Sequence, residues 1–90
     1  MALLAMDETA QPTTFSGLLI RYRKRAGYSR NKLAHTVGVD PSYLTRIEND
    51  ERAAPGVKIL DAIIRSLRLT PTERDRLLAL AGYAPVALRR

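Results

Sequence analysis

Cysteine is absent from the 90 residues, and histidine occurs only once. The lack of cysteine excludes disulfides, thiolate metal sites and cysteine nucleophiles, and it is consistent with a reducing compartment. His35 has no second histidine near it, so we expect a surface side chain and no metal site. No apolar run reaches the roughly 18 residues that a membrane-spanning helix requires. We therefore expect a cytoplasmic protein with no membrane segment, no metal and no cofactor.

Signals for catalysis and for export are missing as well. No glycine-rich phosphate loop is present, and the Ser, His and Asp residues near one another fall on predicted helices without a supporting pocket, so we expect no enzyme. The chain begins with a short apolar run, but no basic segment precedes it and acidic Asp7 and Glu8 follow, which makes it a poor signal peptide. We expect residues 1–13 to form a flexible tail.

Basic residues are in excess. Hydrophobic residues make up 46% and charged residues 27%, which at this length predicts one small globular domain. Fifteen Lys and Arg against nine Asp and Glu give a net charge of +6, a balance that attracts polyanions. Most of the cations are arginine, whose fork suits phosphates and guanine edges. A GC-rich genome would produce the same arginine bias.

Apolar residues recur at helical spacing almost throughout, and no segment alternates with period two, which predicts an all-α fold of five helices. The first helix has its apolar stripe on Phe15, Leu18, Leu19, Tyr22 and Ala26. Gly27 is expected to stop this helix. The cations Arg21, Lys24 and Arg25 are interpreted as a solvated helix end, which the helix dipole favours.

Two short helices follow in close succession. Ser29 is expected to cap a second helix over residues 30–37, which Gly38 ends. Asp40 is expected to cap a third, which starts at Pro41, where the missing N–H of proline costs nothing, and runs to about Asn49. Two such helices joined through a tight glycine turn predict a helix-turn-helix.

The residues around the turn support this motif. Gly38 supplies the positive φ that a sharp reversal needs. Small Ala34 lets the two helices approach, and Leu44 and Ile47 face back from the second helix of the motif. Three further apolar side chains are expected to fill the elbow: Leu33, Val37 and Val39.

The last two helices are expected to complete the core. The fourth has its apolar face on Val57, Leu60, Ile63, Ile64 and Leu67. A capping box at residues 70–73 opens the fifth, which stops at Gly82. Two interpretations of the apolar residues after residue 76 remain open. These apolar residues are Leu77, Leu78, Leu80, Val86 and Leu88. Either they complete the core, or Leu80, Tyr83 and the tail form a dimer contact.

Over about residues 15–69 the chain resembles the Xre/Cro/C1 or lambda-repressor-like helix-turn-helix proteins. The similar stretches are "LLIRYRKRAGYSRNKLAHTVGV", "SYLTRIENDERAAP" and "LDAIIRSLRLT". The resemblance implies a five-helix DNA-binding domain, here residues 14–82, that binds palindromic operators as a homodimer and regulates transcription. Residues 83–90 would be a tail with a possible dimer contact.

The resemblance also implies roles for single residues. Arg23 would form a structural pair with Glu48, which would otherwise repel phosphate from a DNA-facing helix. Asn49 would touch the DNA backbone. The base-reading face would consist of Pro41, Ser42, Thr45 and Arg46. Arg46 is the best candidate for base readout, because guanine offers two acceptors to its fork, although a phosphate contact or a solvated position is an equal alternative.

Other cations are candidates for phosphate contacts. Arg30 and Lys32 fall in the first turn of the second helix, where the dipole disfavours cations, so local stability does not explain them and a bound phosphate would. The alternative is that they are exposed solubilising charges. Tyr43 is expected to pack or to touch the DNA backbone, and Arg52, in the loop after the third helix, lies within reach of phosphates.

The sequence departs from the family pattern in three places. Arg30 and Pro41 stand where glutamine is common. Arg30 could keep a phosphate contact, whereas Pro41 removes an amide that could read adenine, so the operator cannot be transferred from relatives. "NDER" replaces the common "NGKR", which leaves Asp50 in a possible left-handed turn that aspartate tolerates. A rival hypothesis is a protein-interaction module on the same scaffold, such as an antitoxin or a transcription bridging factor.

Overall fold

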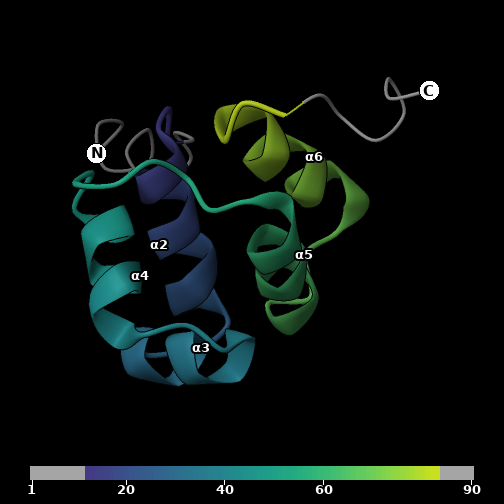
Figure 1. Ribbon diagram of the computed structural model, residues 1–90. Coiled ribbons are helices and arrows are strands. Elements are labelled where there is room, and N and C mark those ends of the chain that lie inside the picture. The colour runs from purple at the N-terminus through teal and green to yellow at the C-terminus, as the bar shows by residue number, and fades with distance from the viewer. Residues whose placement is uncertain (1–11, 84–90) are drawn as a thin grey trace, which may run out of the picture.

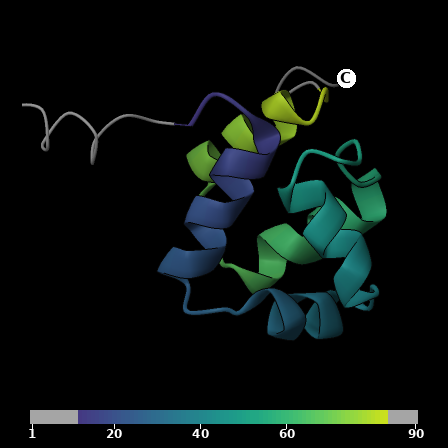
Figure 2. The same cartoon turned by 90° about the vertical axis from the view of Figure 1, so that its left-hand side faces the viewer.

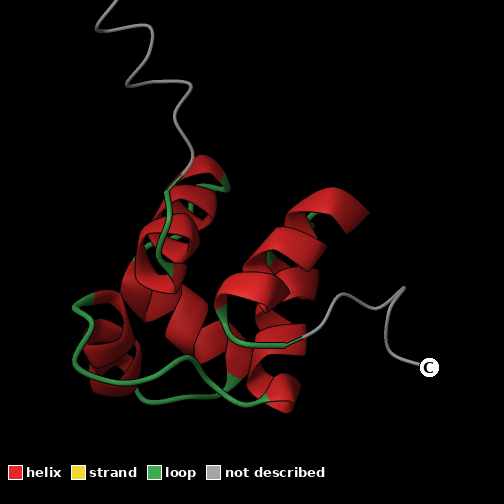
Figure 3. Cartoon of the chain, turned by 90° about the horizontal axis from the view of Figure 1, so that it is seen from above, coloured by secondary structure: helices red, strands yellow, loops and turns green. Residues whose placement is uncertain are grey.

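The computed structural model describes residues 12–83 (Figure 1). The expected tail at residues 1–13 therefore lies almost wholly outside the described residues, as do Val86 and Leu88 of the possible dimer contact. The described part contains five α-helices and no strand, which confirms the predicted all-α architecture (Figure 3). These helices are α2 (Phe15–Arg25), α3 (Arg30–Val37), α4 (Pro41–Glu48), α5 (Val57–Ser66) and α6 (Pro71–Leu80).

Four of the five helices begin at a residue whose side chain accepts a hydrogen bond from a free N–H group, and α5 begins at Gly56 without such a bond. Oγ1 of Thr14 accepts a hydrogen bond from the Gly17 N–H, and Oγ of Ser29 accepts one from the Lys32 N–H. The expected capping box of α6 is present, with Thr70 and Glu73 bonded reciprocally at 3.2 and 3.0 Å. Proline occupies the first turn of both α4 and α6.

Gly38 ends α3 with φ +81°. The N–H of Val39 reaches back to the Ala34 carbonyl at 2.9 Å, and the Gly38 N–H reaches the His35 carbonyl at 3.3 Å, which is a Schellman arrangement. This turn brings α3 and α4 together, and α3 also packs against α5. Helix α2 contacts α4 and α6, which lie on different sides of it (Figures 1 and 2).

All five helices contribute to one hydrophobic core. The side chains with at most 1% exposure include Leu18, Leu19, Leu33, Leu44, Ile47, Leu60, Ile63 and Leu77. Burying a leucine or isoleucine fully contributes about 1.5–3 kcal/mol each, so the core is the main source of stability. No helix in residues 12–83 is long and apolar enough to cross a membrane.

Two residues assigned to apolar faces lie outside the core. Val57 is 47% exposed because it is the first residue of α5 and precedes the buried turn. Ala26 is exposed because α2 already ends at Arg25, one residue earlier than the stripe suggested. Leu80 and Tyr83 are partly buried against the core, so in this chain they contribute to packing.

Candidate nucleic-acid interface

Helix α4 has one buried face and one exposed face. Leu44 and Ile47 are 1% exposed and pack into the core. Of the four residues expected to read bases, Pro41, Ser42 and Arg46 are exposed and Thr45 is half-buried. The structure therefore places these four side chains on the side of α4 away from its core contacts, as the helical spacing predicts.

The two hydroxyl groups on this face are already hydrogen-bonded as donors. Oγ of Ser42 donates to Oδ1 of Asp40 at 2.6 Å, and Oγ1 of Thr45 donates to the Pro41 carbonyl at 3.0 Å. Each oxygen can still accept a hydrogen bond, but neither offers a free proton in this arrangement. Arg46 has no ion pair with any residue of the described part, so its guanidinium is the available donor on this face.

Asp40 has a second role beside its capping bond. Hydrogen bonds from the Ser42 hydroxyl and the Ser42 N–H lower the pKa of the Asp40 carboxyl, and the positive charge of Arg46 adds to the effect. The carboxylate is therefore ionised at neutral pH. It fixes the start of α4 and holds the Ser42 hydroxyl toward the helix.

A hollow lies beside α4 at the first turn of α3. It has a volume of about 490 Å³ and is lined by Ser29, Arg30, Asn31 and Thr45. The first N–H groups of a helix have no intrahelical partner and carry the positive end of its dipole, so such a hollow suits an oxyanion. Lys32 is exposed on the same first turn. The arrangement can hold a phosphate next to the exposed face of α4.

Glu48 is buried under this surface, with 3% of its side chain exposed. Arg23 donates from Nε to Oε2 at 2.6 Å and from Nη2 to Oε1 at 3.0 Å, and its Nη1 donates to the Tyr28 carbonyl at 2.9 Å. This is the pair that the resemblance implied. Its two parallel bonds neutralise the carboxylate and fasten α2 to α4.

Arg30 also approaches Glu48, with Nε 3.6 Å from Oε1. The prediction that local stability does not explain Arg30 is therefore wrong. The carboxylate attracts this cation across the turn and holds it at the rim of the hollow. Lys32 has no ion pair of this kind within the described residues, so for Lys32 a phosphate contact stays a prediction.

The loop after α4 has a defined conformation. Asp50 takes the left-handed region at φ +62°, as the missing glycine suggested, and its Oδ1 accepts a hydrogen bond from Oγ of Ser16 at 2.7 Å. The Arg52 guanidinium lies 4.9 Å from the centre of the Tyr43 ring, a cation–π distance. Tyr43 is half-buried against the core, and Asn49 is exposed at the end of α4.

Two side-chain contacts between distant parts of the chain could not be predicted from the sequence. Ser16 is 5% exposed and holds Asp50 across 34 positions, and no local pattern indicates such a partner. Arg25 lies exposed in the last turn of α2, as predicted, but it also pairs with Glu73 of α6 through bonds of 2.5 and 3.0 Å. This pair was not predicted because the dipole argument considers only the helix on which the cation lies.

Comparisons with known proteins agree with this geometry. A family model described as helix-turn-helix matches residues 19–74, more than half of the chain. The chain is 45% identical over 58 residues to the HTH-type transcriptional regulator SlrR of Bacillus subtilis (strain 168), covering 63% of this chain and 38% of that protein. It is 40% identical over 43 residues to the HTH-type transcriptional regulators SinR of B. subtilis (strain 168) and of B. licheniformis, covering 48% of this chain and 39% of each. The chain thus spans less than two-fifths of the length of these relatives. No solved structure matches it significantly.

Proposed function

Because this chain belongs to the Xre/Cro/C1-type helix-turn-helix family, we propose that it binds double-stranded DNA at specific sequences and regulates transcription in the cytoplasm. The matching regulators support this proposal, and they do not favour the protein-interaction module as its main role. Residues 14–82 form the DNA-binding domain. The role is one of binding, without catalysis.

One observation carries the proposal. The exposed face of α4 lies beside a hollow at the N-terminus of α3, and Thr45 belongs to both. When α4 enters the major groove, Arg46 meets base edges while a backbone phosphate reaches the first turn of α3. Base reading then involves Pro41, Ser42, Thr45 and Arg46, and the phosphate contacts involve Arg30, Lys32, Tyr43, Asn49 and Arg52.

The buried pair below this surface makes the interface possible. An unpaired Glu48 would repel the phosphates that Arg30 attracts. With Arg23 and Arg30 both facing Glu48, the three side chains together keep a charge of one positive unit. The interface therefore remains attractive to DNA.

The operator is palindromic in this proposal, and two copies of the chain bind it. Two-fold symmetry places the two α4 helices in successive major grooves, about 34–36 Å apart or a multiple of that distance. The segment 83–90 supplies the dimer contact.

The test is selection of bound duplexes from a random DNA pool, followed by titration of the selected duplex and a scrambled duplex at two salt concentrations. We expect an enriched palindrome whose affinity falls with salt but remains above that of the scrambled duplex, because released counterions contribute equally to both and base contacts only to one. Equal affinity for both duplexes at both salt concentrations would contradict the proposal.

A further inference from the structure

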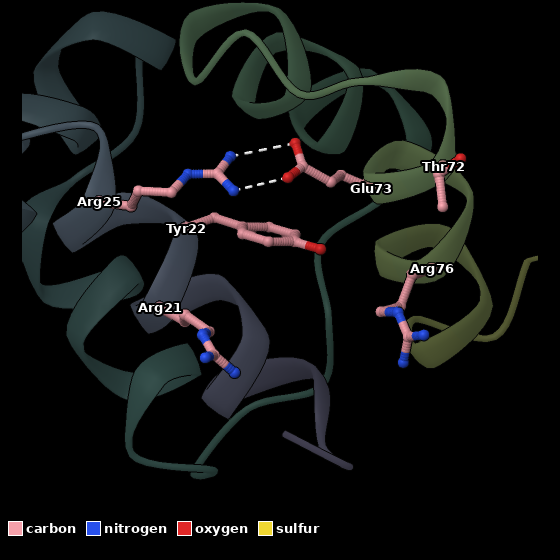
Figure 4. A pocket seen from close by; sticks show the side chains of 6 residues that line it. All are labelled: Arg21, Tyr22, Arg25, Thr72, Glu73 and Arg76. Carbon is pink, nitrogen blue, oxygen red and sulfur yellow. Dashed lines mark hydrogen bonds and ion pairs between the residues drawn. The ribbon is translucent and has the colours of Figure 1, made fainter. Parts of the chain in front are cut away.

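A second cavity lies between α2 and α6 (Figure 4). It has a volume of about 350 Å³ and is lined by Arg21, Tyr22, Arg25, Thr72, Glu73 and Arg76. Neither α3 nor α4 contributes a residue to it, and α4 lies on a different side of α2 from α6 (Figures 1 and 2). The cavity is therefore separate from the surface proposed to bind DNA.

The charges that line the cavity do not cancel. Its one acid, Glu73, accepts two bonds from Arg25 at 2.5 and 3.0 Å and is neutralised by that arginine. The Arg25 guanidinium also lies 4.9 Å from the centre of the Tyr22 ring, so it is held against two lining residues. Arg76 then gives the cavity an excess positive charge, and Arg21 is a further cation in its lining. Arg76 is exposed and has no ion pair with any residue from 12 to 83.

Tyr22 places a polar group at the inner wall. Only 5% of this residue is exposed, yet its hydroxyl points into the space between the two helices and toward α6 (Figure 4). No buried side-chain oxygen or nitrogen of the described part lacks a hydrogen-bond partner, so this hydroxyl, which lines the cavity without a bond to another described residue, is reached by solvent from the cavity and can donate to a ligand there. Burial raises the pKa of this phenol above its ordinary value, so it is a proton donor at neutral pH.

We infer that this cavity binds the phosphate group of a small molecule, with Arg76, Arg21 and the Tyr22 hydroxyl as its donors. A phosphate has three terminal oxygens, so it can accept bonds from donors on both helices at once. The volume lies at the lower end of the range for small-molecule sites, which suits a compact phosphorylated compound. The hydroxyl of Thr72, on the first turn of α6, is a further group in the lining.

The test is a titration of the ¹⁵N-labelled protein with phenyl phosphate and with inorganic phosphate, at an ionic strength kept constant with chloride. We expect saturable shifts at the amides of Tyr22, Thr72 and Arg76. Stronger binding of phenyl phosphate identifies an organic ester as the ligand, and equal binding of the two probes identifies free phosphate. Either result supports the site.

Three variants make the test specific. Arg76→Gln removes a cation that has no ion pair within residues 12–83, and Tyr22→Phe removes the hydroxyl and keeps the buried ring. Each should weaken binding by about ten-fold or more, the effect of one hydrogen bond to a charged group. Lys24→Gln removes the same charge from an exposed position of α2 outside the cavity lining. This variant should change the affinity by less than about two-fold, since solvent screens the charge of Lys24 from the cavity.

Four results would overturn the inference: shifts that do not saturate, equal weakening in Lys24→Gln and Arg76→Gln, shifts at Ser29 and Arg30 instead, or the same lining amides responding to duplex DNA. The first two would indicate unspecific attraction to a basic surface. The third would place the phosphate at α3, and the fourth would make the cavity part of the DNA surface. Because the small-molecule titration contains no DNA, its failure leaves the proposed regulatory function untouched.

Discussion

Arg23 and Glu48, 25 positions apart, form a buried pair of two parallel hydrogen bonds that joins α2 to α4. The pair lies directly beneath the exposed face of α4, so it fixes the orientation of that helix. Its geometry is bidentate, and Arg23 has a further bond to the Tyr28 carbonyl, which leaves the guanidinium well satisfied.

Arg23→Met should lower the free energy of unfolding by about 3 kcal/mol, because it leaves a carboxylate buried with only the more distant Arg30 beside it. The double variant Arg23→Met, Glu48→Leu should be less destabilised than Arg23→Met alone, since no buried charge remains. Urea unfolding, monitored by circular dichroism, gives the free energy of unfolding of the parent protein, the single variant and the double variant. A double variant at least as unstable as the single one would show that the pair contributes mainly through packing.

Gly38→Ala tests the turn of the motif. An added Cβ meets no atom within 4 Å, so any cost comes from the backbone at φ +81° and not from a clash. An alanine in the left-handed region costs about 1–2 kcal/mol. Gly56→Ala is the matched control, because its Cβ also meets open space and its φ is −67°. We expect that control to change the thermal stability little, and equal losses in both variants would rule out this explanation.

The helices could be predicted from the sequence because their signals are local. Ser29, Asp40 and Thr70 cap the helices that follow them, and Gly38 has the positive φ that the turn requires. The errors occurred at helix ends: Val57 extends the apolar period before the first buried turn of α5, and Ala26 extends it past the last residue of α2. Periodicity describes a face of a helix, but it does not show where a neighbouring helix ceases to cover that face.

Contacts between distant positions were predictable only where the family resemblance supplied them. It implied the pair of Arg23 with Glu48, but it gave no indication of the bond from Ser16 to Asp50 or of the pair between Arg25 and Glu73. Both missed contacts depend on how α2 lies against other segments of the fold. Spacing along a single helix contains no information about that packing.

Arg46→Ala should reduce affinity for the selected operator by about 1–3 kcal/mol and relax the preference at one base position, since it removes a donor to a base edge. Fold stability should change little, because Arg46 has no ion pair within the described part of the chain. Arg65→Ala is the control. It removes the same charge from an exposed position of α5, outside the base-reading face. Unchanged affinity and preference in Arg46→Ala would assign base reading to other residues.

Arg30→Ala should behave differently from Arg46→Ala. Loss of a phosphate contact weakens all duplexes to a similar degree and lowers the slope of log affinity against log salt by about 1. The measurement is the salt dependence of binding to the selected and the scrambled duplex. A loss confined to the selected duplex would instead indicate that Arg30 reads a base.

The contact between α2 and α6 predicts a pH dependence of stability. Hydrogen bonds from Arg25 lower the pKa of Glu73 to about 2, from an ordinary value of 4.5, and the Thr70 N–H adds to the effect. A carboxyl whose pKa is lower in the folded state stabilises the fold above its unfolded pKa. This contribution is lost as the pH falls from about 4.5 toward 2.

Glu73→Gln should therefore be less stable than the parent protein at pH 7 by about 1 kcal/mol, a value kept small because half of the Arg25 side chain is exposed. Glutamine can preserve the capping box, so the variant isolates the charge. Thermal unfolding at pH 7, 4, 3 and 2 should show the difference shrinking toward zero at the lowest pH, where the parent carboxyl is also neutralised. Asp61→Asn, which breaks an exposed pair within α5, should change stability by less than about 0.5 kcal/mol at pH 7. A difference for Glu73→Gln that persists unchanged at pH 2 would mean that shape, and not ionisation of Glu73, joins α6 to α2.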